Sequence, residues 1–260
     1  MPPSSLPLSN WFVVSLRPVG QHRRLLRAVK ALGAGGLSLP GLRLAAREDT
    51  PTRVALDAAT QCSRVVFTSP AAVRFSVRMR TLRAQPRQAV LALGEATRTA
   101  LRRAGIAEVV VPAQATSESL LALPELAAVR GARIGMVTAP DGRGLLARQL
   151  HQRGATLVIA EVYARMPARL NRIHAQRVLD ARGGRGAVCV TSAEALRNVL
   201  AALPDAARAV LLRCVAIASS ERLVAIAHDA GFHTVIRADA PTPRSLLETL
   251  CAHASQRGFR

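Results

Sequence analysis

The sequence predicts an α/β fold in which parallel β-sheets are covered by helices on both faces. Two observations support this prediction: short apolar runs alternate with amphipathic segments along the chain, and stretches of one half resemble stretches of the other. Apolar residues fill most positions of each run instead of every second one, as is typical of strands buried on both faces. The alternation of such strands with helices indicates parallel sheets.

The elements follow one another in a regular order. Strands are predicted for the apolar runs WFVVSL (11–16), SRVVFTS (63–69), AVLALG (89–94), EVVVP (108–112), ARIGMVT (132–138), ATLVIAEVY (155–163), GAVCVTS (186–192), AVLLRCVAIAS (209–219) and HTVIRAD (233–239). Helices are predicted for the amphipathic segments 20–32, 71–79, 95–105, 117–126, 142–154, 193–203, 220–231 and 243–254, whose apolar residues are spaced as one helix face requires.

Three pairs of stretches indicate an internal duplication. The segment 105–123 aligns with 231–250, TSPAAVR (68–74) with TSAEALR (191–197), and RRLLRAVKALGA (23–34) with GLLARQLHQRGA (144–155), at nearly constant separation. The chain is therefore predicted to be a tandem of two similar α/β units. Each unit has enough β-α repeats for a flavodoxin-like open sheet, which binds ligands beyond the carboxyl ends of its strands.

The charge is strongly positive, with 36 basic residues against 16 acidic ones. Every basic residue except Lys30 is an arginine, whose planar guanidinium suits carboxylate and phosphate. One interpretation is a biased Ala-, Arg- and Leu-rich composition with solvated arginines on helix surfaces. The other is a polyanionic partner.

The sequence argues against several classes of protein. The four cysteines (Cys62, Cys189, Cys214 and Cys251) form no C-x-x-C pair, and the histidines lack metal-binding spacing, so neither a disulfide framework nor a metal site is predicted. No G-x-G-x-x-G, P-loop lysine or G-x-S-x-G motif occurs. No apolar run is long enough to span a membrane, and the start MPPSSLPLSNWFVV lacks the basic region of a signal peptide, so we expect a soluble cytoplasmic protein.

Polar residues collect where predicted strands give way to helices. They are Arg17, Thr68, Ser69, Glu95, Thr97, Ser117, Asp141, Arg143, Thr191, Ser192, Ser219 and Ser220. Each hydroxyl is explained by helix capping alone. As a set on strand ends that face one side, they also suit the binding of carboxylates or phosphates, which helix N-termini favour.

Tyr163 is the only tyrosine and ends the apolar run VIAEVY. One interpretation is a half-buried packing residue. The other is a proton donor, because a phenol with its ordinary pKa near 10 is protonated at neutral pH.

The chain resembles the uroporphyrinogen-III synthase family over roughly residues 11–252. The resemblance is carried by SLRP (15–18), VVFTSPAAV (65–73), LALGEATRTALRRAG (91–105), VPAQATSESLL (111–121), GRGLLARQLHQRGA (142–155), EVYAR (161–165), VTSAEAL (190–196) and VAIASSERLVAIAHDAGF (215–232). Each motif is loose, and their order and spacing together are specific.

The resemblance implies two flavodoxin-like domains with parallel sheets, joined by a two-strand linker, with a substrate cleft between them. The domains would be 10–39 plus 167–260 and 43–163, with linkers near 39–42 and 163–168. The implied reaction needs no cofactor. Hydroxymethylbilane, a polycarboxylate, would lose water and close to uroporphyrinogen III with inversion of its last ring. The implied protein is a monomer that binds neither nucleic acid nor membrane.

The resemblance also implies roles for individual residues. Tyr163 would assist departure of the hydroxyl, with Thr97 in a G-x-x-T turn as a second catalytic residue. Substrate-binding roles would fall to Arg17, Ser69, Ser117, Arg143, Thr191, Ser192 and Ser220. The chain departs from the family pattern at Ala71 and where the second G-x-x-T turn reads ASSER.

Two other functions stay open at this point. A basic nucleic-acid-binding protein would explain the charge, but the seven aromatic residues offer few stacking platforms and no known binding motif occurs. A non-catalytic tetrapyrrole-binding relic of the family would keep the fold and lose turnover, because fold alone does not establish activity.

Overall fold

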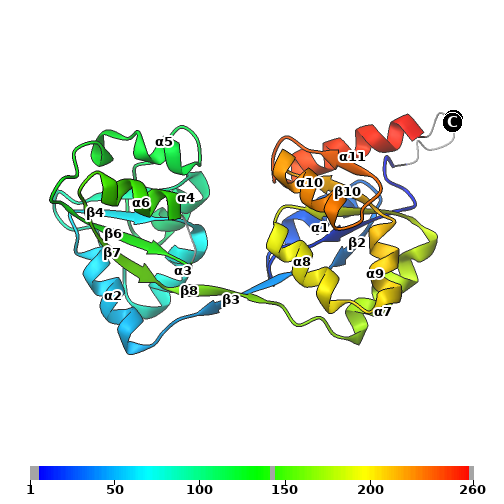
Figure 1. Ribbon diagram of the computed structural model, residues 1–260, viewed down its shortest axis with the longest axis horizontal. Helices are drawn as coiled ribbons and strands as arrows, with labels where there is room; N and C mark the ends of the chain where they lie inside the picture. Colours follow the sequence, from blue (N-terminus) through cyan, green and yellow to red (C-terminus); the bar gives the residue numbers. More distant parts are fainter. Residues whose placement is uncertain (1–5, 141–143, 258–260) are drawn as a thin grey trace. The chain divides into compact units, whose positions relative to one another are not determined.

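The computed structural model describes residues 6–140 and 144–257, with the side chain of Arg257 left aside (Figure 1). The chain divides into two compact units. Unit 1 comprises the chain up to Arg43 and from Met166 onward, and unit 2 comprises Leu44–Arg165.

Unit 1 contains a five-stranded parallel sheet in the order β11-β10-β9-β1-β2. The strands are β1 (Trp11–Ser15), β2 (Gly35–Ser38), β9 (Arg185–Val190), β10 (Val215–Ala218) and β11 (Val235–Arg237). The helices are α1 (Arg23–Ala31), α7 (Arg172–Asp180), α8 (Ala193–Ala202), α9 (Asp205–Leu212), α10 (Glu221–Asp229) and α11 (Pro243–Arg257), with a 3-10 turn η2 (Ala181–Gly183).

Strand β1 shows how the unit 1 sheet is covered on both faces. All five of its residues are buried. Phe12 and Val14 pack into a core with residues of α7, α8, α9 and α10, whereas Trp11 and Val13 pack into a second core with residues of α1 and α11. Successive side chains of a strand point to opposite faces, so a strand between two helical layers must be apolar throughout.

Unit 2 contains a four-stranded parallel sheet in the order β5-β4-β6-β7. The strands are β4 (Arg64–Phe67), β5 (Ala89–Ala92), β6 (Arg133–Thr138) and β7 (Thr156–Glu161). The helices are α2 (Thr50–Thr60), α3 (Pro70–Met79), α4 (Glu95–Arg103), α5 (Ser117–Leu121) and α6 (Gly144–Gln152), with a 3-10 turn η1 (Pro124–Leu126). Residues of α2, α3 and α4 pack in the core with Phe67, and residues of α5 and α6 pack with Val66 on the other face.

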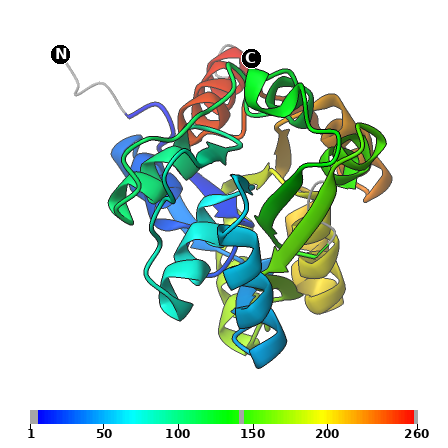
Figure 2. The ribbon, with the colours of Figure 1, turned by 90° about the vertical axis from the view of Figure 1, so that its left-hand side faces the viewer.

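Helix α2 lies along β6 and β7 in unit 2 (Figure 2). It begins at Asp49, whose carboxylate accepts a hydrogen bond from the Thr52 N–H at 2.9 Å. The close approach to β6 depends on Gly135, because a Cβ there would lie 2.0 Å from the backbone oxygen of Ala59. Where the chain passes between the units, β3 (Leu42–Ala46) and β8 (Tyr163–Pro167) form a separate two-stranded sheet.

The structure confirms the predicted α/β class with parallel sheets and corrects three predicted strands. The run 209–219 is a strand only from Val215, because Ala209–Leu212 belongs to α9, which Pro204 and Asp205 start in a segment rich in alanine and leucine. The run 108–112 is reduced to one bridge between Val110 and Leu91. The run 155–163 is two strands, β7 and β8. In the described part of the chain, no helix is long and apolar enough to cross a membrane.

Candidate functional site

The polar residues that follow the strands of unit 2 lie at one edge of its sheet. Because all four strands are parallel, their carboxyl ends meet there. Ser69 follows β4, Thr97 lies in the helix after β5, Thr138 ends β6 and Tyr163 comes two residues after β7. Topology therefore brings these residues, distant in sequence, to the edge where open α/β sheets bind ligands.

Tyr163 and Ser69 are in direct contact at this edge. The Tyr163 Oη and the Ser69 Oγ are 3.0 Å apart, a hydrogen-bond distance. Ser69 Oγ also accepts a hydrogen bond from the Ala72 N–H at 3.0 Å and so caps helix α3. The Tyr163 ring stacks on Phe75 with centroids 5.4 Å apart and planes inclined by 17°. The phenol is thus held both by its ring and by its hydroxyl.

Two arginines flank the Phe75 ring on which Tyr163 is stacked. The guanidinium carbons of Arg74 and Arg78 lie 5.0 and 5.7 Å from the ring centroid, a range in which a cation is attracted to an aromatic face. Arg78 also pairs with Glu48 at 3.0 Å. The helix that holds the serine and the aromatic pair therefore also carries positive charge.

The other hydroxyls at the unit 2 edge are buried. Thr68 Oγ1 donates to Thr138 Oγ1 at 2.9 Å, which ties the end of β4 to the end of β6. Thr97 is 3% exposed in the first turn of α4. Ser117 is buried as the first residue of α5, and its neighbour Thr116 caps that helix by accepting from the Ser119 N–H at 3.1 Å.

In unit 1 the predicted serines cap helices at the carboxyl ends of β9 and β10. Ser192 Oγ accepts from the Ala195 N–H at 3.2 Å at the start of α8. Ser220 Oγ accepts from the Leu223 N–H at 3.4 Å at the start of α10. Thr191, which precedes Ser192, is half-buried. The capping interpretation is therefore confirmed for Ser69, Ser192 and Ser220.

Arg17 lies beyond the carboxyl end of β1, at the same edge of the unit 1 sheet. Its Nη2 donates to the Pro241 carbonyl oxygen at 2.5 Å, which fixes the side chain to the loop between β11 and α11. Its Nε is buried without a hydrogen-bond partner in the described residues. Burial lowers the pKa of the guanidinium, which is nevertheless charged at neutral pH.

His22 is a polar residue of this edge that the sequence did not single out. Its Nδ1 is 2.9 Å from the Oγ of Ser15, which is fully buried. Its Nε2 is buried and, among the described residues, has no hydrogen-bond partner. The unpartnered nitrogens of His22 and Arg17 mark a place where a polar ligand would gain hydrogen bonds that the protein does not supply.

Stability is expected to fall below about pH 6.5 because of His22. Burial lowers the pKa of His22 from its ordinary value of 6.5, and the nearby Arg17 and His174 lower it further. Folding therefore favours the neutral ring, so its contribution is complete above pH 6.5 and is lost as the pH falls through the folded-state pKa. Melting temperatures measured from about pH 7.5 to about pH 5.5 should fall less for His22→Gln than for the parent chain.

The matched control for this pH dependence is His233→Gln, which removes an exposed histidine of the same unit. This variant should melt with the pH dependence of the parent chain. Equal pH dependence in all three proteins would show that His22 does not cause the loss of stability.

The cysteines and the acidic residues form no second reactive centre. Burial raises the pKa of the Cys189 and Cys214 thiols to about 12, so both are protonated at neutral pH and are poor nucleophiles. Within residues 6–140 and 144–257, no three His, Cys, Asp or Glu side chains are grouped as metal ligands. Of the predicted site residues, Arg143 lies outside the described residues.

Sequence comparisons point to one family. The profile of the family described as "Uroporphyrinogen-III synthase HemD" matches residues 23–248. The uroporphyrinogen-III synthase of Salmonella typhimurium is 30% identical over 246 residues, which cover 92% of this chain and 99% of that protein. The uroporphyrinogen-III synthase of Escherichia coli is 31% identical over 161 residues, 61% of this chain and 65% of that protein.

Solved structures show the same fold at lower sequence identity. A mutant uroporphyrinogen III synthase from the extremely thermophilic bacterium Thermus thermophilus matches with a TM-score of 0.60 and 18% identity, over 95% of this chain and 99% of that one. The uroporphyrinogen-III synthetase of Helicobacter pylori matches with a TM-score of 0.58 and 15% identity, over 93% of this chain and 98% of that one.

Proposed function

Because the chain belongs to the uroporphyrinogen-III synthase family and is a lyase of haem biosynthesis, we propose that Tyr163, held by Ser69, starts its reaction. The family acts on hydroxymethylbilane. In the proposed first step the C–O bond of the hydroxymethyl group breaks, Tyr163 donates its phenolic proton to the departing oxygen, and water leaves. The pyrrole nitrogen supplies the electron pair, which gives an azafulvene-type cation.

The remaining steps join the carbon skeleton and restore the proton. The cation is attacked by the last pyrrole ring, which inverts through a spiro intermediate before the macrocycle closes as uroporphyrinogen III. The proton that the ring carbon loses on closure returns the tyrosine to its phenol form. No step draws on an added oxidant or reductant, and the enzyme contributes mainly by holding the bent chain in the productive geometry.

The contact between Tyr163 and Ser69 is the observation that carries this proposal. A phenol whose ring is stacked on Phe75 and whose oxygen lies 3.0 Å from a serine oxygen has little freedom to turn. Such fixed placement is what general-acid catalysis requires of a proton donor.

We assign substrate-binding roles to Arg17, Ser69, Ser117, Arg143, Thr191, Ser192 and Ser220, and a supporting catalytic role to Thr97. Helix capping is compatible with these roles. In Ser192 and Ser220 the Oγ accepts from a backbone N–H, so the hydroxyl proton is left to donate to a carboxylate oxygen. Arg17 brings a cation to the same edge of the unit 1 sheet, as a substrate with many carboxylates needs.

We also propose that residues 10–39 with 167–260 and residues 43–163 are the two domains, and that the enzyme works in the cytoplasm as a monomer. The compact units of the structure support this division, with boundaries at Arg43 and Arg165. The chain would act without cofactor, metal or nucleic acid.

A product analysis tests the function. Fresh hydroxymethylbilane is mixed with the protein, the products are oxidised, and the porphyrin isomers are separated. Uncatalysed closure gives isomer I, so a dominant isomer III establishes ring inversion by the chain. Isomer I alone, from protein shown to be folded, would overturn the proposed activity and favour a binding protein that has lost turnover.

Replacing Ser69 with alanine is expected to lower kcat by about tenfold through misplacement of Tyr163. The substitution also removes the cap of α3, which costs about 1 kcal/mol of stability. Asp49→Ala is the matched control, since it removes the cap of α2 in the same unit without touching Tyr163. If both variants keep the kcat of the parent chain, Ser69 acts only as a cap.

A further inference from the structure

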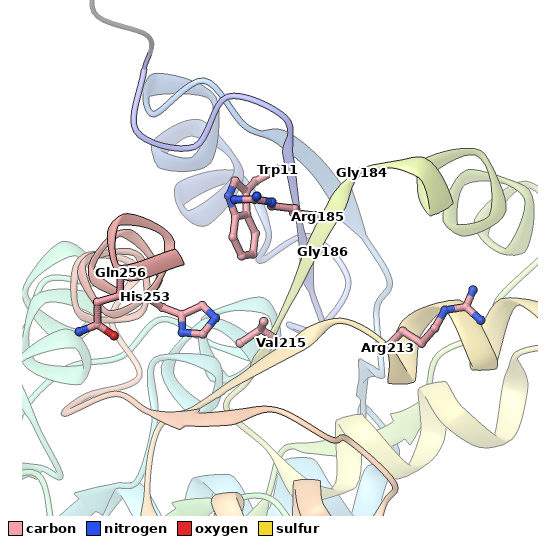
Figure 3. A pocket seen from close by; sticks show the side chains of 8 residues that line it. All are labelled: Trp11, Gly184, Arg185, Gly186, Arg213, Val215, His253 and Gln256. Atoms are coloured by element: carbon pink, nitrogen blue, oxygen red, sulfur yellow. The ribbon is translucent and has the colours of Figure 1, made fainter. Parts of the chain in front are cut away.

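A second site is built at the edge of the unit 1 sheet opposite to the strand ends described above. A cavity of about 670 Å³ opens at the amino ends of three adjacent strands (Figure 3). Trp11, Arg185 and Val215 are the first residues of β1, β9 and β10, and all three line it. At about 3.3 Å per residue along β9, the cavity is on the order of 15 to 20 Å from the carboxyl edge.

Glycine keeps the floor of this cavity open. Gly186, the second residue of β9, lines the cavity beside Val215. A Cβ at this position would lie 2.3 Å from the Cys214 Sγ and 2.4 Å from the Phe12 Cζ, so core packing excludes any side chain there. The backbone and Val215 are therefore left as a flat floor.

Aromatic and amide groups form the walls. The Trp11 indole meets the His253 ring edge-to-face, with centroids 6.4 Å apart and planes inclined by 76°. His253 and Gln256, both from α11, extend toward the cavity in Figure 3. Trp11 is 6% exposed, which means that its ring is held rigidly by the core behind it.

The charge of the lining is positive. Arg185 and Arg213 both line the cavity, and no aspartate or glutamate stands among its described lining residues. Figure 3 shows the Arg185 side chain beside the Trp11 indole, whereas Arg213 extends away from it. An aromatic wall next to a guanidinium suits a planar ring that carries a carboxylate, because the guanidinium fork matches the two carboxylate oxygens.

We propose that this cavity binds a small planar aromatic carboxylate, with the ring against Trp11 and the carboxylate on Arg185. The volume falls within the range of small-molecule sites. The site is separate from the carboxyl edges to which the reaction is assigned, so a ligand here occupies the protein without competing for the serines and Arg17 of those edges.

The single tryptophan of the chain provides a direct test. Its indole N–H gives one cross-peak in a proton–nitrogen correlation spectrum, and that peak reports on this cavity alone. The full-length protein is titrated with naphthalene-2-carboxylate and, separately, with naphthalene-2-carboxamide, which has the same shape without the charge. We expect a saturable shift with the carboxylate at a dissociation constant of about 1 mM or lower, and at least tenfold weaker binding of the amide.

Two variants assign the charge recognition to Arg185. Arg185→Gln should weaken binding of naphthalene-2-carboxylate at least tenfold, and Arg182→Gln should leave it unchanged, because Arg182 is exposed in η2 and does not line the cavity. The proposal is overturned if the indole peak does not shift. It is also overturned if acid and amide bind equally, or if the two variants weaken binding alike.

Discussion

Replacing Tyr163 with phenylalanine is expected to lower kcat by about 10²- to 10⁴-fold, the range that a positioned general acid contributes. Phenylalanine keeps the ring that stacks on Phe75 and loses only the hydroxyl that lies 3.0 Å from Ser69. KM should change little, because the lost group acts on the departing hydroxyl and contributes little to binding of the intact substrate. Steady-state rates of isomer III formation measure both constants.

The stability of Tyr163→Phe serves as its control. Loss of one hydrogen bond costs about 0.5–1.5 kcal/mol, and Ser69 keeps its bond from the Ala72 N–H. The variant should therefore melt cooperatively close to the parent chain. A folded variant with the parent kcat would remove Tyr163 from the mechanism and leave it as a packing residue.

Replacing Gly135 with alanine is expected to have the largest effect on stability. The new Cβ would lie 2.0 Å from the Ala59 oxygen and 2.7 Å from the Ala59 carbonyl carbon, both of them backbone atoms of α2. Helix α2 must then move away from β6, and overpacking of this kind costs about 1–3 kcal/mol or more. Chemical denaturation with a circular-dichroism readout measures the loss.

Gly144→Ala is the matched control for Gly135→Ala. Gly144 begins α6 in the same unit, has no neighbouring atom within 4 Å of an added Cβ, and is not at positive φ. The two substitutions change the unfolded chain in the same way, so the difference between them isolates the contact with α2. We expect Gly144→Ala to be neutral or to stabilise by up to about 1 kcal/mol. Equal effects of the two variants would contradict the packing argument.

The fold class could be predicted because burial on two faces leaves a direct mark on the sequence. Trp11–Ser15 is apolar except for its last residue because it lies between two helical layers. The same signal failed at Ala209–Leu212, since a short apolar run fits a buried helix as well as a strand. Val110 makes only a single bridge, so the apolar run around it does not extend into a strand.

The site was predictable as a set of residues and not as a set of contacts. Ser69 and Tyr163 were both singled out, but they are 94 positions apart and only the fold shows that their oxygens meet. Thr116 instead of Ser117 caps α5, a one-residue choice that depends on local backbone angles. His22 gave no sequence signal because its role rests on a contact with Ser15 across the turn that follows β1.

The insertion of unit 2 into unit 1 has a consequence for synthesis on the ribosome. Val14 in the strand β1 pairs with Val188 in β9, so this pairing awaits the last third of the chain. Unit 2 is complete at Arg165 and can fold first. The remaining chain takes on the order of 5 to 20 seconds to translate, and during this time the five core residues of β1 have no sheet to join. Nascent chains should therefore be most exposed to chaperone binding and aggregation at this stage, through their amino-terminal strand.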